Sequence, residues 1–441
     1  MNQFNYLDNP LTPTNGMQAV PHTIEPSGFS GANLSPKSST LPPGINNMEN
    51  LITLILLQNG GVFNANAAGM LLQVLGVPVT PANVNAILNT VLTGTGGNNT
   101  AAAVIPFFNH FANAGPETLI QPPSNNHFAN IIRDNVPLYA RVVDIAMLGA
   151  HNAFTSGIEP TSAIDPNDSM YGSDLLALAP GFVSRFARTQ YGNAMRLLNN
   201  GVRYLDVRVT NVNGEWYTEN TMLSTRLSYY ISDVIRFLQQ NRGELVIFDL
   251  QHINFGNASL DQLWSYISGI RVNGQNLFEF VHVNPNRSPL STLTLGEATR
   301  GGTSSGVIIL ANQPVSESRP IHYDRSLNMR SRWLQQDNIP GLINAIEGEQ
   351  SLIGDGRYSN ILRVNQASLA FGTSGNGLLN SINSWSYMFM AERTNSVLLA
   401  QDLNRWLSVT PILMVGFAES AYSNFNSQVI HVINSFNRNL K

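Results

Sequence analysis

The sequence has no cysteine in its 441 residues, and charged side chains are scarce. The lack of cysteine excludes disulfide bonds, zinc-thiolate sites and thiol nucleophiles. Asp, Glu, Lys and Arg together make up only 12% of the chain, and the formal net charge is -4. This balance gives no electrostatic footprint for nucleic acid and no polybasic patch for an anionic membrane. We therefore expect no nucleic-acid partner.

Long apolar runs are missing as well. The longest mainly aliphatic run, residues 51–57, contains a threonine and is far shorter than the roughly 18 to 20 residues that cross a bilayer. Residues 1–6 have neither the basic start nor the apolar run of a secretory signal. The sequence thus predicts no transmembrane segment and no ordinary export, which leaves cytoplasmic accumulation or non-standard release.

Residues 1–131 differ in composition from the rest. Their only charged side chains are Asp8, Glu25, Lys37, Glu49 and Glu117. Residues 1–46, rich in Pro and Asn, are expected to form an extended or disordered arm. Residues 47–131 are expected to form a small helical region, with helices at 48–57, at 67–75 and after the candidate N-cap Thr80. These helices need a partner surface, and the sequence leaves open packing on the next domain, on one another or on a second copy of the chain.

From residue 132 onward, strand patterns alternate with helix patterns, which is typical of a parallel α/β sheet or barrel. The expected strands are residues 142–148, 202–209, 245–250, 307–311, 361–364 and 412–417. The clearest helix pattern covers residues 224–240, with one apolar stripe and a stop at Gly243. The glycine-rich stretches match neither a GxGxxG nor a Walker pattern, so nucleotide binding has no support.

Two of the expected strands end in polar or charged residues. Asp206 and Arg208 lie on one face of the strand at 202–209, where an Arg fork can hold a phosphate and an Asp can orient it. The alternative is a structural Asp-Arg pair. His151 follows the first strand and a glycine, a suitable place for a general base or for a hydrogen-bonded structural histidine.

Five segments occur in a specific order. They read LGAHN at 148–152, GVRYLDVR at 201–208, ELVIFDLQH at 244–252, TLTLG at 292–296 and PILMVGF at 411–417. Together they resemble the X domain of phosphatidylinositol-specific phospholipase C, in particular its metal-independent bacterial members and single-domain relatives. The resemblance covers about residues 137–437. It implies a distorted, partly open TIM-type barrel, which we assign to residues 132–441.

The resemblance also implies a chemistry. In that family one His removes the proton of the inositol 2-hydroxyl, which attacks phosphorus, while an Arg neutralises the phosphoryl oxygens and a second His protonates the diacylglycerol. His151 matches the base and Arg208 the phosphate clamp, with Asn152, Asp206 and Tyr217 as further substrate-binding candidates. Arg208 stands where calcium-dependent members carry a carboxylate, so the resemblance implies neither a metal nor another cofactor.

The sequence departs from the family pattern at three positions. Asn152 replaces an Asp of the bacterial members, Glu219 stands where the family has its acid His, and Gly416 replaces an Asp on the last strand. Glu219 fits the acid role only if burial raises its pKa by about two units or more. His252, at the end of the next strand, is the alternative acid or else a hydrogen-bonding residue.

Two hypotheses about function therefore stay open. The first is a metal-independent phosphodiesterase that acts on inositol phospholipids or glycosyl-inositol lipids, with a phospholipid or inositol phosphate head group as partner and peripheral membrane contact. The second is a catalytically degenerate barrel that serves in binding, storage, self-assembly or a toxin complex, with homo-oligomerisation through residues 1–131.

Overall fold

The structure is a computed structural model that describes residues 45–75, 77–116, 128–168, 178–316, 318–354, 356, 358–370, 381 and 384–440. The predicted arm at residues 1–46 lies almost wholly outside this part of the chain. Across the described ranges, no helix combines the length and apolar character that a membrane crossing needs.

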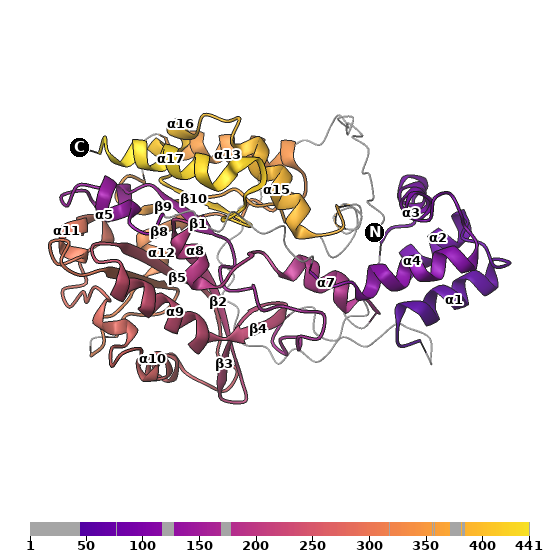
Figure 1. Ribbon diagram of the computed structural model, residues 1–441, viewed down its shortest axis with the longest axis horizontal. Coiled ribbons are helices and arrows are strands. Elements are labelled where there is room, and N and C mark those ends of the chain that lie inside the picture. The colour runs from indigo at the N-terminus through magenta and orange to yellow at the C-terminus, as the bar shows by residue number, and fades with distance from the viewer. Residues whose placement is uncertain are drawn as a thin grey trace. The chain divides into compact units, whose positions relative to one another are not determined.

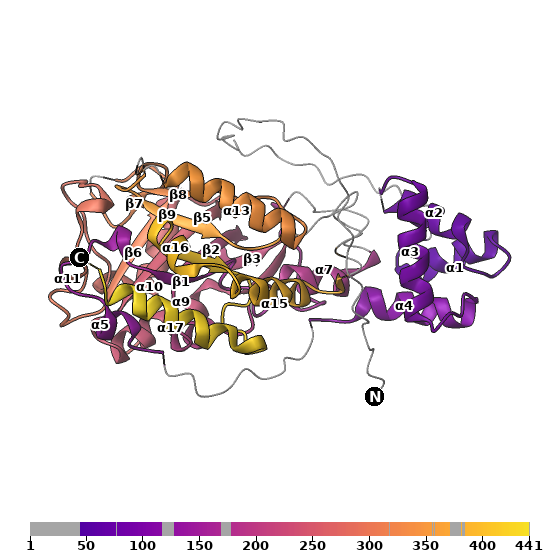
Figure 2. The same ribbon diagram turned by 90° about the horizontal axis from the view of Figure 1, so that it is seen from above.

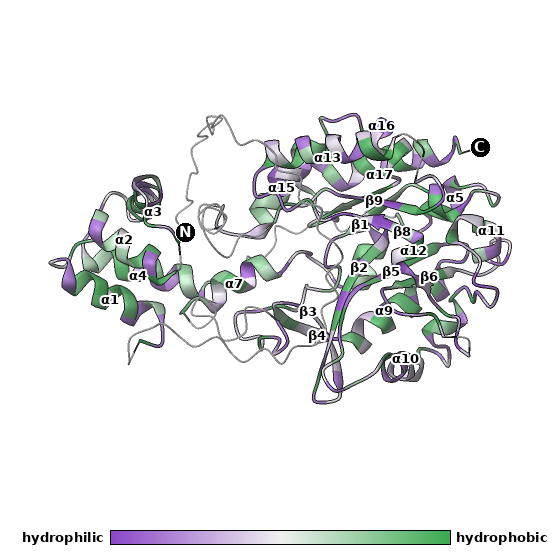
Figure 3. Cartoon of the chain, turned by 180° about the vertical axis from the view of Figure 1, so that it is seen from behind, coloured by the Kyte–Doolittle hydropathy of each residue, from purple (hydrophilic) through white to green (hydrophobic). Residues whose placement is uncertain are grey.

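The region before the barrel is helical, as predicted. Its helices are α1 (Met48–Gln58), α2 (Ala65–Val74), α3 (Pro81–Gly94) and α4 (Ala101–Asn113). The side chains of Asn47, Asn64 and Thr80 each cap a helix start by accepting a backbone N–H. Helix α1 is mostly hydrophobic (Figure 3), and its buried residues join the apolar core. Apolar packing, rather than charge pairing, thus stabilises these helices.

Strands and helices alternate after residue 131. The strands are β1 (Met147–Ala150), β2 (Val202–Val212), β3 (Glu215–Asn220), β4 (Met222–Arg226), β5 (Leu245–Asn254), β6 (Gly306–Ala311), β7 (Tyr323–Asp324), β8 (Met329–Ser331), β9 (Leu362–Gln366) and β10 (Ile412–Val415). The α-helices are α5 (Ile131–Asn135), α7 (Pro180–Ala187), α8 (Ala194–Asn199), α9 (Leu227–Gln240), α10 (Leu260–Gly269), α11 (Leu295–Ala298), α12 (Arg325–Asn328), α13 (Ile339–Ile353), α15 (Tyr387–Leu398), α16 (Leu403–Val409) and α17 (Phe425–Asn437). Short 3-10 helices cover Val142–Asp144, Leu277–Glu279, Leu290–Thr292 and Tyr422–Asn424.

The strands form one sheet in the order β7-β6-β5-β2-β1-β10-β9-β8, with every pair along this path parallel. The edge strands β7 and β8 follow one another in the chain, joined by the short helix α12, and do not pair. The sheet therefore curls into a barrel that stays open at one seam (Figure 1). This confirms the expected distorted, partly open TIM-type barrel.

Helices cover the outside of the strands. Helices α9 and α10 lie on one side, and α13, α16 and α17 lie on the other (Figure 1). Viewed from above, α13, α16 and α17 overlie the strands between β1 and β9 (Figure 2). Helix α17 buries Phe425, Val429, Ile430 and Ile433. The helices thus shelter the outer face of the sheet, and the curl of the barrel encloses the inner face, so strands such as β6 and β10 are buried at every residue.

Two expected elements are partly wrong. Residues 142–148 were expected to be one strand, but Val142–Asp144 is a 3-10 helix and the strand begins at Met147. The helix expected at 224–240 begins at Leu227, because Met222–Arg226 pairs with β3 in an antiparallel hairpin on the edge of β2. Tertiary pairing here overrides the helical pattern. The short strands β7 and β8 had no signal in the sequence.

Candidate active site

The carboxyl end of β1 holds His151 and Asn152. His151 Nδ1 lies 3.0 Å from Asp206 Oδ2 on the neighbouring strand β2. Asn152 has a left-handed backbone (φ 44°), a conformation that Asn tolerates better than most residues. Its N–H then donates to the same Asp206 oxygen at 3.1 Å. The turn after β1 thus aims two donors at one carboxylate.

Asp206 is a buried carboxylate that stays ionised. Burial opposes its ionisation, but the hydrogen bond from His151 and the charges of His151 and Arg208 outweigh that effect, so the pKa of Asp206 lies below its ordinary value. An ionised Asp206 accepts the Nδ1–H of His151 and leaves the Nε2 lone pair free to accept a proton. The pair thus has the arrangement of an oriented general base.

The position of the His151 ring is fixed by its surroundings as well. The indole of Trp333 stacks on the imidazole, with ring centroids 5.2 Å apart and planes 11° from parallel. The His151 carbonyl accepts hydrogen bonds from the Thr189 hydroxyl at 3.0 Å and from Gln190 Nε2 at 2.7 Å. These contacts hold backbone and ring in one orientation, which a base needs.

Arg208 lies two residues beyond Asp206 and faces the same side of β2. Among the residues that the structure describes, it makes no hydrogen bond and no ion pair, and its buried Nε has no partner. The predicted alternative, a structural ion pair between Asp206 and Arg208, is therefore wrong. A buried guanidinium nitrogen without a partner is costly, so its environment is suited to an anion.

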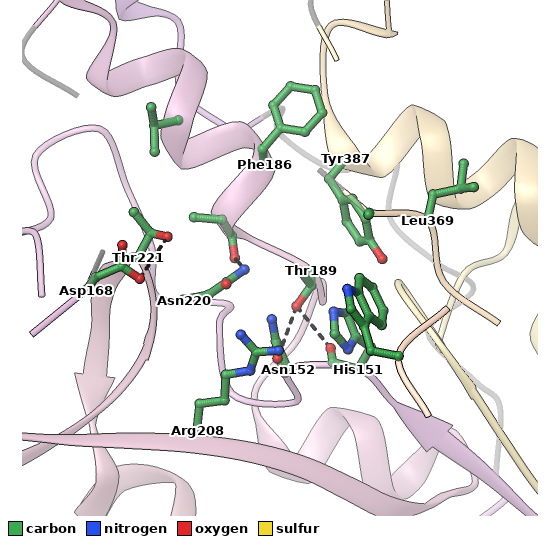
Figure 4. Close-up of a pocket in the computed structure, with 14 residues that line it drawn as sticks. His151, Asn152, Asp168, Phe186, Thr189, Arg208, Asn220, Thr221, Leu369 and Tyr387 are labelled. Carbon is green, nitrogen blue, oxygen red and sulfur yellow. Dashed lines mark hydrogen bonds between the residues drawn. The ribbon is translucent and has the colours of Figure 1, made fainter. Parts of the chain in front are cut away.

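His151, Asn152 and Arg208 line one cavity of about 260 Å³. Figure 4 shows the Arg208 guanidinium directed toward Asn152 and Thr189, close to the imidazole. The remaining lining is Asp168, Val183, Phe186, Ala187, Thr189, Asn220, Thr221, Trp333, Leu369, Ala370 and Tyr387. One wall is polar and the other apolar, so the cavity suits a ligand with both a charged and an apolar part.

Glu219 is buried at the end of β3, beside the lining residues Asn220 and Thr221, but does not itself line the cavity. Its Oε2 accepts the N–H of Thr221 at 3.1 Å. Burial raises the pKa of Glu219 to about 7, with Asp165 and Asp168 adding to this rise and Arg208 opposing it. A carboxyl with this pKa is partly protonated near neutral pH and can donate a proton.

The other predicted site residues lie elsewhere. His252 pairs in register with Arg208, is solvent-exposed and does not line the cavity. Desolvation, followed by the charge of Arg208, lowers the pKa of His252. Tyr217 lies on β3 and interacts with Arg226, away from the cavity lining. The structure therefore groups His151, Asn152, Asp206 and Arg208, but not these two.

Several lining residues had no signal in the sequence. Trp333 follows the short strand β8, and Thr221 lies in the turn between β3 and β4. Thr221 has φ 62°, a left-handed backbone that is strained for a β-branched residue. Its hydroxyl donates to Asp168 Oδ2 at 3.3 Å. Such strain is concentrated at functional sites, but it cannot be read from a single Thr.

Comparisons with known proteins show which proteins this chain is similar to. No family model matches the chain. It is 27% identical over 231 residues to the variant-surface-glycoprotein phospholipase C of Trypanosoma cruzi, across 49% of this chain and 58% of that protein. It is 30% identical over 218 residues to the protein of the same name from Trypanosoma brucei brucei, across 46% of this chain and 57% of that protein. A PI-PLC X domain-containing protein of Dictyostelium discoideum is 32% identical over 100 residues, across 22% of this chain and 17% of that protein.

The chain is thus similar to proteins named variant-surface-glycoprotein phospholipase C and to a PI-PLC X domain-containing protein. It spans less than two thirds of the length of the two trypanosomal relatives. A solved variant of the Staphylococcus aureus phosphatidylinositol-specific phospholipase C shares the fold, with a TM-score of 0.50 and 14% identity over 70% of this chain and 97% of that one. The barrel fold is thus common to this chain and the bacterial enzyme despite low sequence identity.

Proposed function

We propose that this protein is an X-domain-type phosphodiesterase that cleaves inositol phospholipids or glycosyl-inositol lipids. The observation that carries the proposal is that the His151–Asp206 pair and the unpaired Arg208 converge on one cavity. The names of the trypanosomal relatives support the lipid class, because both are called phospholipases C of a variant surface glycoprotein. The alternative of a purely binding or storage barrel gains no such support.

His151 is the general base in this proposal. Its Nε2 takes the proton of the inositol 2-hydroxyl, and the hydroxyl oxygen attacks the neighbouring phosphorus. The bond from phosphorus to the glycerol oxygen breaks, which yields a cyclic inositol phosphate and diacylglycerol. Asp206 holds the imidazole in the required tautomer and stabilises the imidazolium that forms.

Arg208 neutralises the phosphoryl oxygens. Negative charge grows on these oxygens in the transition state, and a guanidinium fork matches their geometry with two parallel N–H donors. Because this fixed positive charge faces the cavity, we include metal independence in the proposal. Activity is then expected to persist in the presence of a chelator.

Glu219 supplies the proton to the leaving glycerol oxygen. Its pKa of about 7 keeps a useful fraction protonated at neutral pH, and the adjacent residues Asn220 and Thr221 line the cavity. Neither Glu219 nor His252 lines the cavity itself. His252 is the weaker candidate because it is exposed, whereas Glu219 is buried directly before two lining residues.

The test is phosphorus NMR of phosphatidylinositol vesicles incubated with the protein in EDTA. We expect a cyclic inositol phosphate signal that His151→Ala abolishes. His431→Ala is the matched control, because His431 is exposed on α17 and its loss is expected to leave the rate unchanged. If no cyclic inositol phosphate forms even at high enzyme concentration, the proposal is refuted and the binding or storage alternative is favoured.

Two partner predictions belong to this proposal. Peripheral contact with a lipid surface predicts that the protein cosediments with phosphatidylinositol vesicles. Association through residues 1–131 predicts a mass above that of one 48.2 kDa chain in light scattering. A monomer that stays in the supernatant would contradict both predictions.

A further inference from the structure

The apolar wall of the cavity contains one hydroxyl. Tyr387, the first residue of α15, is 3% exposed and lines the cavity together with His151. Its ring lies 6.5 Å from the imidazole and 6.1 Å from the Phe417 ring, measured between centroids. Figure 4 shows the phenol oxygen pointing from the apolar wall toward the His151 end of the cavity. The phenol thus reaches the polar end from the apolar side.

The Tyr387 hydroxyl has no hydrogen-bond partner among the described residues. The Ser368 hydroxyl is close enough to lower the pKa of Tyr387, but the two hydroxyl groups do not meet hydrogen-bond distance and angle, and both lack a partner among the described residues. Leaving a buried hydroxyl unpaired costs on the order of 1 to 3 kcal/mol. Because this hydroxyl lines the cavity, a bound ligand can supply the missing partner.

Gly416 makes room for this ring. It follows Val415, which pairs with Ala150 directly before His151. A Cβ at Gly416 would lie 2.6 Å from Tyr387 Cε1 and 2.9 Å from its hydroxyl oxygen. Any side chain at 416 would therefore displace the phenol. The lack of a side chain at Gly416, directly after β10, thus allows the Tyr387 ring to pack beside the His151 imidazole.

Other unpartnered polar atoms lie in the same cavity lining. Asn152 Oδ1 and Arg208 Nε are buried without a partner among the described residues. With the Tyr387 hydroxyl they offer two donors and one acceptor to a single ligand. Burial raises the pKa of Tyr387 to about 12, so the phenol keeps its proton at neutral pH and remains a donor.

We propose that Tyr387 is a further catalytic residue, whose hydroxyl donates a hydrogen bond to a non-bridging oxygen of the phosphodiester held by Arg208. The proposal rests on the proposed function. Arg208 approaches the phosphoryl group from β2 and Tyr387 approaches it from α15, so two oxygens are held from different sides. A donor that is already in place stabilises the charge that develops on such an oxygen.

The test is Tyr387→Phe, which removes only the hydroxyl. We expect kcat/KM on phosphatidylinositol vesicles to fall about 10- to 100-fold. The melting temperature is expected to stay unchanged or rise, because the variant also removes an unpaired buried group. A structural role for the hydroxyl would instead lower the melting temperature. If the wild type is active and the kcat/KM of Tyr387→Phe differs from it by less than about twofold, the proposal is overturned. A joint loss of activity and stability in the variant also overturns it.

Tyr191→Phe is the matched control. The Tyr191 ring also packs against Phe417, with ring centroids 4.5 Å apart. The Tyr191 hydroxyl donates to the Glu392 carboxylate. Tyr191 does not line the cavity. We expect this variant to lose stability and keep its activity, the reverse of Tyr387→Phe. Gly416→Ala, which displaces the phenol, is expected to reproduce the activity loss of Tyr387→Phe.

Binding of inorganic phosphate tests the role of Tyr387 independently of lipid cleavage. Its binding to wild type and to Tyr387→Phe is measured by phosphorus NMR in the absence of lipid. We expect the variant to bind phosphate about 5- to 10-fold more weakly. If the wild type shows no lipid turnover, weaker phosphate binding by the variant still supports Tyr387 as a phosphoryl ligand, and equal binding overturns it.

Discussion

Strand β2 carries two arginines with opposite surroundings. Arg203 is fully buried, and its Nε donates to Glu244 Oε2 at 2.7 Å. Its other nitrogens donate to the backbone carbonyls of Leu198, Val202, Phe128 and Ala129. Arg208 has no such partner among the described residues, although it lies on the same strand. Because side chains alternate along a strand, the two arginines face opposite sides of the sheet.

The difference separates a structural arginine from one that is available to a ligand. The guanidinium of Arg203 uses its donors within the protein and connects β2 to α8 and to the residues just before α5 and β5. Arg208 keeps its donors for the cavity. Arg203 is fully buried and Arg208 is half-buried, but the number of satisfied donors is what separates the two roles.

Arg208→Ala is expected to give the largest effect. Loss of a guanidinium from a transferring phosphoryl group lowers rates by roughly 10³- to 10⁵-fold, while stability is expected to change little because no partner is left unpaired. Arg208→Lys keeps the charge but not the fork, and should recover only part of the rate. Kinetics and thermal melts of the same samples check this, and a large drop in melting temperature would show that Arg208 is structural after all.

Arg203→Met sharpens the comparison from the other side. It leaves Glu244 as a buried carboxylate without its charged partner, which destabilises a protein by about 3 to 5 kcal/mol. The free energy of unfolding from urea titration measures this loss. The rate per folded molecule is expected to match the wild type, and a normal stability in this variant would contradict the structural role.

Glu219 is expected to make stability depend on pH. Its folded pKa of about 7 lies above the ordinary value of 4.5, so the protonated form is favoured in the folded state. The corresponding stability is fully present below about pH 4.5 and is lost as pH rises through about 7, a change of up to roughly 3 kcal/mol. Glu219→Gln should remove this part of the pH dependence and slow turnover by about 10²-fold. Urea titrations at acidic and alkaline pH measure the free energy of unfolding of both proteins. If this free energy depends on pH in the same way in the variant and the wild type, the raised pKa of Glu219 is contradicted.

Thr221→Gly is expected to give the smallest effect. Glycine adopts the φ of 62° at this position without strain, so stability should rise by roughly 1 kcal/mol. The backbone N–H that Glu219 accepts is retained. Asn213→Gly is the control, because Asn213 has a similar φ of 54° and Asn tolerates it. Equal shifts in the two melting temperatures would argue against strain at Thr221.

The sequence predicted six of the eight strands along the sheet path and the polar residues at two strand ends. Local patterns suffice there, because an apolar strand followed by a glycine and a polar residue places His151 at the sheet edge. The partners of these residues were harder to predict. Asp206 was assigned to the substrate, whereas in the structure it contacts His151. The two residues are 55 positions apart in the chain, and only the parallel pairing of β1 and β2 brings them together.

The amino-acid sequence by itself indicated a parallel α/β sheet or barrel, the helical region before it and the strand ends that carry His151 and Arg208, and the resemblance to a known family implied the barrel. Periodic apolar patterns and helix caps are local, so they can be read along the chain. Only the tertiary structure decided that Arg208 stays unpaired, that Glu219 has a raised pKa and that Trp333 and Tyr387 reach the same cavity. Those properties depend on burial and on contacts between distant segments, which the local sequence pattern does not specify.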